Sequence, residues 1–129
     1  MITALYTSLL GILWLGLTMY VILGRWKYGV SLGDGEQKDL NRRIRAHANF
    51  METVPFAVLL LWIGEIHVFS PDVVHAFGIT LVVSRLFHAF GMLIPKRSTN
   101  RFRQIGMALT MTMIGVASLW ILAAIVFNQ

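Results

Sequence analysis

Four polar side chains of complementary chemistry recur at helical spacing in the segment 41–55. They are Arg42, Arg45, Asn49 and Glu52. Intervals of three, four and three residues place two guanidinium groups, an amide and a carboxylate on one face of a helix. Guanidinium groups bind anions through paired N–H donors, so this stripe is a candidate anion-binding surface. The spacing also leaves open a simpler interpretation, a solvated helix face stabilised by ion pairs.

Glu52 stands immediately before the apolar part of its segment, where a carboxylate without a partner is costly to desolvate. We therefore expect it to pair with Arg45 or with a cation from another helix or subunit. Further along, Arg85 and His88 share a helix face inside an apolar run, near the same level as Asn49. We expect these two polar faces to converge. The alternative for His88 is a structural role as a hydrogen-bonded group.

Two more guanidinium groups, Arg101 and Arg103, open the last apolar segment. They either anchor in anionic headgroups or join the other polar faces in a cationic pocket at one membrane surface. The ligand of such a pocket is expected to be anionic, amphipathic and partly peptide-like. The chain has no cysteine, and its histidines follow no metal-ligand spacing, so we predict no metal site.

The composition indicates that membrane helices position these side chains. The 129 residues are 57% hydrophobic and 13% charged, with a mean hydropathy of +0.69. A soluble domain of this size could not bury so much apolar surface. Four apolar segments are long enough to cross a bilayer, at about 2–24, 48–69, 72–94 and 104–127. We therefore predict an all-α integral membrane protein whose residues 1–129 form one four-transmembrane-helix domain.

The segments between these spans predict the connections and the orientation. We expect a polar connector over about 25–41, a compact break at 70–72 and a second polar connector over 94–100. Nearly all basic residues gather at the two connectors: Arg25, Lys27, Lys38, Arg42, Arg43, Arg45, Lys96, Arg97, Arg101 and Arg103. The positive-inside rule makes this side cytoplasmic and places both termini outside. Because these charges interrupt apolar segments, no nucleic-acid partner is expected.

The polar pattern also carries a family resemblance. It reads Arg42-x-x-Arg45-x-His47-x-Asn49-x-x-Glu52-x-x-Pro55, followed by Arg85-x-x-His88. This pattern resembles that of MAPEG, the membrane-associated proteins in eicosanoid and glutathione metabolism, and the compact chain is more similar to bacterial members. The resemblance covers nearly the whole chain. It implies a homotrimer of four-helix subunits in a bacterial inner (plasma) membrane, with glutathione bound between neighbouring subunits at the cytoplasmic end.

The resemblance further implies roles for single residues. Glutathione-contacting positions are matched by Arg45, Asn49, Glu52, His88 and Arg101, and the site is extended by Arg42, Arg85 and Arg103. Arginines would bind the glutathione carboxylates, and Glu52 would accept from its ammonium group. Arg101, with Arg103 as its substitute, would stabilise the glutathione thiolate. A hydrophobic electrophile would arrive from the lipid side.

The implied function is that of a membrane glutathione transferase or peroxidase that conjugates or reduces hydrophobic electrophiles, with glutathione as cosubstrate. The alternative is a non-catalytic member that binds a lipid or an anionic small molecule. Ala48 favours this alternative, because eicosanoid-forming members carry arginine at that position. Met92 and Ile105 favour it too, because they stand where those members can carry tyrosine. A small transporter is disfavoured, because no ionisable residue lies near the middle of the first or fourth span.

Overall fold

The computed structural model describes residues 1–94 and 100–127, and these residues form four α-helices. The helices are α1 (Ile2–Tyr28), α2 (Lys38–His67), α3 (Pro71–Leu93) and α4 (Arg101–Phe127). The described residues contain no strand, so the predicted all-α fold is confirmed. Each helix is long and apolar enough to cross a membrane. Lys96 and Arg97, which were predicted to lie in the second basic connector, fall outside the described residues.

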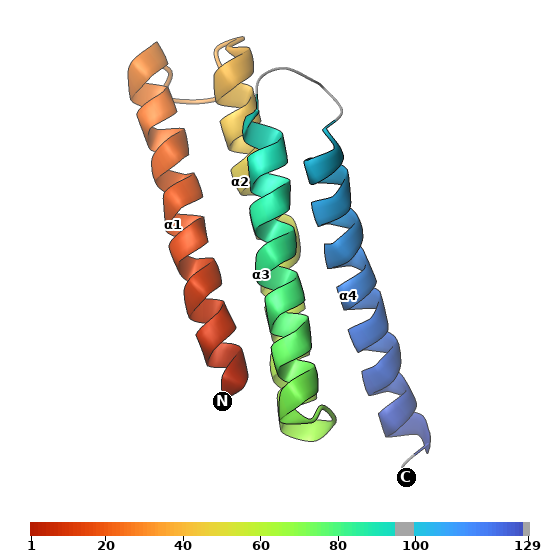
Figure 1. Ribbon diagram of the computed structural model, residues 1–129. Coiled ribbons are helices and arrows are strands. Elements are labelled where there is room, and N and C mark those ends of the chain that lie inside the picture. The colour runs from red at the N-terminus through yellow and green to blue at the C-terminus, as the bar shows by residue number, and fades with distance from the viewer. Residues whose placement is uncertain (95–99, 128–129) are drawn as a thin grey trace.

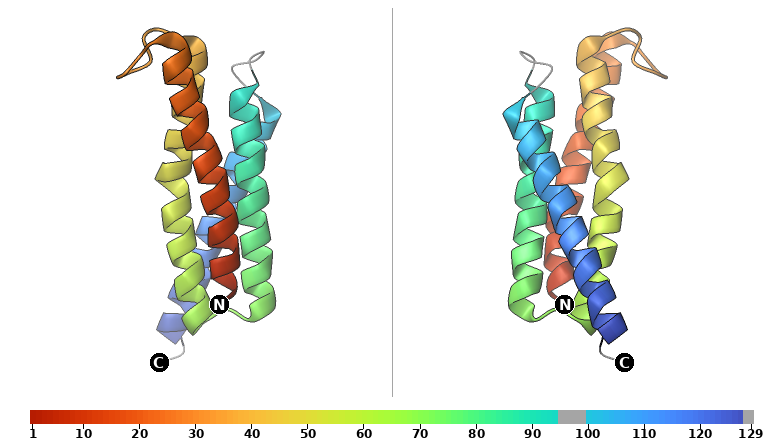
Figure 2. Two further views of the ribbon diagram at one scale, coloured as in Figure 1. Left: turned by 90° about the vertical axis from the view of Figure 1, so that its left-hand side faces the viewer. Right: turned by 90° about the vertical axis from the view of Figure 1, so that its right-hand side faces the viewer.

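The helices run alternately up and down, so the start of α1 and the end of α4 lie at the same end of the bundle (Figure 1). The opposite end holds the junction of α1 with α2 and the beginning of α4, which is where the basic residues gather. α4 crosses the other helices obliquely (Figure 2). Within the described residues it packs on α3 and α2 and makes no contact with α1. The basic end of α4 therefore faces α2 and α3.

The helix ends follow from local sequence signals, and they shorten the expected first connector. α1 continues through Tyr28 and ends at Gly29, whose φ of 64° is the left-handed conformation that favours glycine. The connector is thus 29–37, not 25–41, because both flanking helices extend into the polar segment. Its backbone is fixed from α1, since Arg25 Nη1 donates to the carbonyls of Ser31 at 3.1 Å and Gly33 at 3.0 Å.

The expected break at 70–72 is also seen, because Ser70 occupies the N-cap and Pro71 the first position of α3. α4 begins with a side-chain cap, in which Asn100 Oδ1 accepts from the backbone N–H of Phe102 at 2.9 Å.

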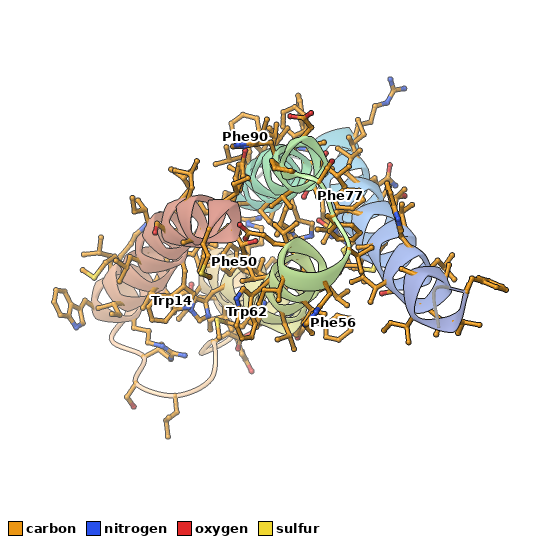
Figure 3. All side chains as sticks on the ribbon, turned by 90° about the horizontal axis from the view of Figure 1, so that it is seen from below. Trp14, Phe50, Phe56, Trp62, Phe77 and Phe90 are labelled. Carbon is orange, nitrogen blue, oxygen red and sulfur yellow. The ribbon has the colours of Figure 1, made fainter. Side chains whose placement is uncertain are left out.

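One cluster of buried apolar side chains joins the four helices, and other apolar side chains point outward. The cluster includes Leu10, Leu17, Phe50, Val54, Ala57, Leu61, Val74, Leu81, Met113 and Ala117. Phe50 lies between helices, whereas Phe56 and Phe90 point away from the bundle (Figure 3). An apolar outer face is stable only where lipid or another subunit covers it, as expected for a membrane-spanning bundle.

Glycine lets α4 approach α3 next to the polar side chains. A Cβ built on Gly106 would lie 2.5 Å from the Ser84 carbonyl oxygen and 2.6 Å from the His88 backbone nitrogen. The hydroxyls of Ser84 and Thr110 are hydrogen-bonded across the same contact at 2.9 Å. The contact positions both His88 and the start of α4.

We expect Gly106→Ala to force α3 and α4 apart, because the added methyl meets backbone atoms that cannot rotate away. Overpacking of this kind lowers the free energy of unfolding by about 1–3 kcal/mol, measured here as a lower Tm in detergent micelles. Gly115→Ala is the matched control, since a Cβ there meets nothing within 4 Å on the same helix. An equal Tm for the two variants would contradict close packing at Gly106.

Candidate functional site

The predicted stripe lies on α2 at the basic end, where Asp39 pairs with Arg42 of the stripe and with the neighbouring Arg43. The Asp39 carboxylate lies 2.8 Å from Arg43 Nη2 and 3.7 Å from Arg42 Nη2. Arg43 also donates to the Tyr20 carbonyl at 3.0 Å and lies 3.8 Å from the centre of the Tyr20 ring. Arg43 therefore ties α2 to α1, and Arg42 shares its anionic partner.

The other end of the stripe is a loose ion pair. Arg45 Nη1 lies 3.8 Å from Glu52 Oε1, and the two side chains are 55% and 54% exposed. Arg45 is thus one of the partners expected for Glu52. At this distance and exposure the pair contributes little stability and leaves both groups accessible.

Arg85 is the most buried charged side chain among the described residues, at 1% exposure. Its Nη1 donates to Thr53 Oγ1 at 2.9 Å and its Nη2 donates to Asn49 Oδ1 at 3.0 Å. Its Nε is buried without a partner, and it forms no ion pair with any carboxylate in the described part of the chain. The polar faces of α2 and α3 therefore converge, as expected, through a guanidinium group bound only to neutral oxygens.

This contact fixes the orientation of Asn49. A guanidinium group has donors only, so the Asn49 atom that faces Arg85 must be the carbonyl oxygen. The Asn49 amide nitrogen is then left for the pocket that Asn49 lines. Asn49 thus offers an N–H donor suited to a ligand carboxylate or thiolate.

His88 also lines that pocket. It is 3% exposed, and its Nδ1 is buried with no hydrogen-bond partner. The pocket has a volume of about 490 Å³ and is lined by Arg45, Asn49, His88, Met92, Arg103, Gln104, Met107, Ala108 and Met111. It therefore combines two guanidinium groups and two side-chain amides with an adaptable methionine wall.

A second pocket of about 490 Å³ continues from the first toward the basic end. It is lined by Asp34, Glu36, Lys38, Asn41, Arg42, Arg45, Gly91, Met92, Ile94 and Arg103. The two pockets share Arg45, Met92 and Arg103, so we describe them together as the basic groove. The groove runs from a charged mouth to a partly apolar inner part, a shape that suits an elongated anion with one apolar or soft end.

The residues predicted from sequence divide into three sets. Lining the basic groove are Arg42, Arg45, Asn49, His88 and Arg103. Arg85 lies behind it and acts on it through Asn49. Glu52 and Arg101 are exposed and line neither pocket, although Glu52 lies 3.8 Å from Arg45, which lines both.

Sequence reasoning missed several residues of the groove. Thr53, which holds Arg85, lies four residues after Asn49 and could have been found from the same helical spacing. Asp34 and Glu36 enter the charged mouth from the connector 29–37, whose path no periodicity predicts. The Asp34 carboxylate accepts hydrogen bonds from the Asn41 side chain and, at 3.0 Å, from the Glu36 backbone N–H. Both contacts lower the pKa of the Asp34 carboxyl.

Two contacts near the outer turn tie α1 to its neighbouring helices. His75 Nδ1 lies 2.7 Å from the Tyr6 hydroxyl, which ties α3 to α1. Glu65 accepts hydrogen bonds from the backbone N–H groups of Ile2 and Thr3 and so caps α1 from α2. Across residues 1–94 and 100–127, no three His, Cys, Asp or Glu side chains gather in a way that could hold a metal ion.

Comparison with known proteins agrees with this arrangement of four apolar helices. The chain is 32% identical over 123 residues to inner membrane protein YecN of Escherichia coli strain K12, a match that covers 93% of this chain and 92% of YecN. YecN of an O6:H1 strain of the same species matches equally well. The model of the MAPEG family matches residues 3–125. The chain therefore belongs to the MAPEG family.

Proposed function

We propose that the protein binds glutathione in the basic groove and transfers it to, or uses it to reduce, hydrophobic electrophiles. The observation that carries the proposal is the groove itself, in which Arg45, Arg103 and the Asn49 amide face one elongated space. Glutathione is an elongated anion with two carboxylates and a thiol. Its carboxylates fit the guanidinium groups, and its thiol end fits the inner part beside His88.

Catalysis in this proposal is electrostatic. A free thiol has a pKa of about 8.5, so only a small fraction is thiolate at neutral pH, and a nearby guanidinium group raises that fraction. Arg101 was the candidate from sequence, but Arg103 lines both pockets and is the better placed of the two in one protomer. We assign thiolate stabilisation to Arg103. The wall of Met107, Ala108 and Met111 would receive an apolar electrophile from the lipid.

The proposal extends to assembly and location. A homotrimer would cover outward apolar side chains and could bring Glu52 or Arg101 of one subunit to the groove of the next. The four apolar helices and the inner-membrane relative support an integral protein of a bacterial inner membrane. We place the basic end in the cytoplasm and both termini outside, as the positive-inside rule expects.

The first test measures glutathione binding to the purified protein in detergent, by native mass spectrometry and by the change in Tm. We expect a raised Tm at millimolar glutathione, one ligand per subunit in a trimer, and conjugation of a chlorinated nitroaromatic compound. Arg45→Ala should weaken binding by about 1–3 kcal/mol, the range for charge-assisted hydrogen bonds. No binding at millimolar glutathione would overturn the proposal.

One observation favours a second candidate, a non-catalytic member that binds a lipid or an anionic small molecule. Arg101, the residue that the family resemblance assigns to the thiolate, is exposed and lies outside the groove of its own protomer. Glutathione binding without turnover of any of several electrophiles would select this candidate.

A further inference from the structure

Three methionine side chains line the inner part of the basic groove, and they come from two helices. Met92 belongs to α3, and Met107 and Met111 lie four residues apart on one face of α4. The same stretch of α4 also contains Met113, which is 2% exposed and belongs to the buried core. Thioethers that line a pocket are soft, polarisable groups that an entering molecule touches. The groove therefore offers sulfur nucleophiles as well as positive charge.

Arg103 neighbours two of these thioethers. It stands four residues before Met107, so the two side chains share one face of α4. A Cβ built on Gly91 would lie 2.3 Å from the Arg103 backbone nitrogen, so the start of α4 meets α3 next to Met92. Met111 is about two helical turns away from Arg103. The fold therefore places a guanidinium group beside Met92 and Met107 in particular.

A thioether beside a guanidinium group favours one reaction, the two-electron reduction of a peroxide. The sulfur lone pair attacks the terminal oxygen of an organic hydroperoxide, the O–O bond breaks, and the proton of the hydroperoxide moves to the alkoxide oxygen. The thioether is thereby oxidised to the sulfoxide, and the hydroperoxide is reduced to an alcohol. Negative charge develops on the leaving oxygen, and a neighbouring guanidinium group stabilises it. Unlike a thiol, a thioether needs no base for this step.

We propose that Met92 and Met107 are a modification site, oxidised to the sulfoxide by organic hydroperoxides when no glutathione occupies the groove. This inference rests on the proposed function for the class of oxidant, since a groove that admits hydrophobic electrophiles also admits organic hydroperoxides. The sulfoxide is polar, so oxidation converts the soft apolar wall into a surface that no longer suits an apolar electrophile. Hydroperoxide in excess of glutathione thus closes the groove to its own substrates.

The test treats the purified protein in detergent with cumene hydroperoxide, without glutathione, and follows each methionine by peptide mass spectrometry. Met19 and Met51 are internal controls, because they are 49% and 44% exposed and do not line the basic groove. Met92 and Met107 are less exposed, so exposure alone predicts that they react more slowly. We expect them to react about tenfold faster, a smaller effect than that of a fully preorganised oxyanion hole because the groove is open to water.

Two variants assign the effect to the guanidinium group. Arg103→Gln should slow oxidation of Met92 and Met107 to about the rate of Met51, because the leaving oxygen then lacks its cation. Lys27→Gln is the matched control, since it removes the same charge at the basic end from a residue that lines neither pocket, and it should keep the wild-type rates. The core residue Met113 should stay reduced in each protein, which shows that the fold is intact.

The wild-type rates alone decide the inference. Oxidation of Met19 and Met51 at least as fast as that of Met92 and Met107 would overturn it, and so would unchanged rates in folded Arg103→Gln. Glutathione sulfonate separates the inference from the proposed function, because it has no thiol to consume the hydroperoxide and should protect both groove methionines only by filling the groove. Selective oxidation without this protection would support the modification site and count against glutathione as the ligand.

Discussion

Asn49→Asp is expected to abolish glutathione binding while leaving the fold at least as stable as the wild type. One oxygen of the new carboxylate takes the place of Asn49 Oδ1, which lies 3.0 Å from Arg85 Nη2. Arg85 then faces a counter-ion instead of a neutral amide. Pairing of a buried charge in this way maintains or raises the Tm. On the groove side an N–H donor becomes a carboxylate oxygen, which repels the ligand. Loss of a charge-assisted hydrogen bond plus this repulsion should weaken binding by about 100-fold or more.

The control for Asn49→Asp is Asn100→Asp. Asn100 Oδ1 caps α4 by accepting from the Phe102 N–H, and aspartate caps helices equally well. The two variants make the same isosteric change of an amide to a carboxylate, so binding should fall only in Asn49→Asp. Tight glutathione binding by that variant, measured by calorimetry in detergent, would mean that the Asn49 amide does not face the ligand.

The helices and the convergence of α2 with α3 were predictable from the sequence because both depend on local periodicity. Uncharged runs of bilayer length give the spans. Spacings of three and four residues put Asn49 on the same face of α2 as Arg45, and Arg85 on the same face of α3 as His88. The Asn49–Arg85 contact shows that these faces meet.

The rotation of α4 was not predictable, because it depends on packing. Arg101 and Arg103 are two residues apart and so point to nearly opposite sides of a helix. Gly106, three residues after Arg103, must face α3 because a side chain there would strike the backbone at Ser84 and His88. This contact turns Arg103 toward the groove and Arg101 away from it. Without this contact, the sequence does not indicate which of the two arginines lines the groove of its own protomer.

The mouth of the groove was also unpredictable, for a different reason. Residues 29–37 have no repeating pattern, and their path depends on left-handed residues and on carbonyls held by Arg25. Polar character alone predicted a connector, but not that Glu36 would line a pocket with Arg103 of α4.

Arg85→Met is expected to stabilise the protein and to impair ligand binding at the same time. Arg85 is 1% exposed, has no described counter-ion and leaves Nε without a partner. Desolvation of this cation therefore lowers the free energy of unfolding. Replacement of a buried charge by an apolar side chain of similar length raises the free energy of unfolding by about 1–4 kcal/mol. Thr53 Oγ1 still donates to the backbone carbonyl of Asn49, so its hydroxyl stays satisfied.

Binding should fall about tenfold or more in Arg85→Met, because nothing then holds the Asn49 amide toward the groove. Arg85→Lys is the informative companion. Lysine keeps the buried charge but, without the planar fork, cannot reach both Thr53 and Asn49, so it should lower the Tm. Opposite shifts in Tm for methionine and lysine would show that the folded state retains this cation at a cost in stability. A lower Tm for both Arg85→Met and Arg85→Lys would instead mean that Arg85 stabilises the contact between α2 and α3. The buried cation would then not lower the stability of the folded state.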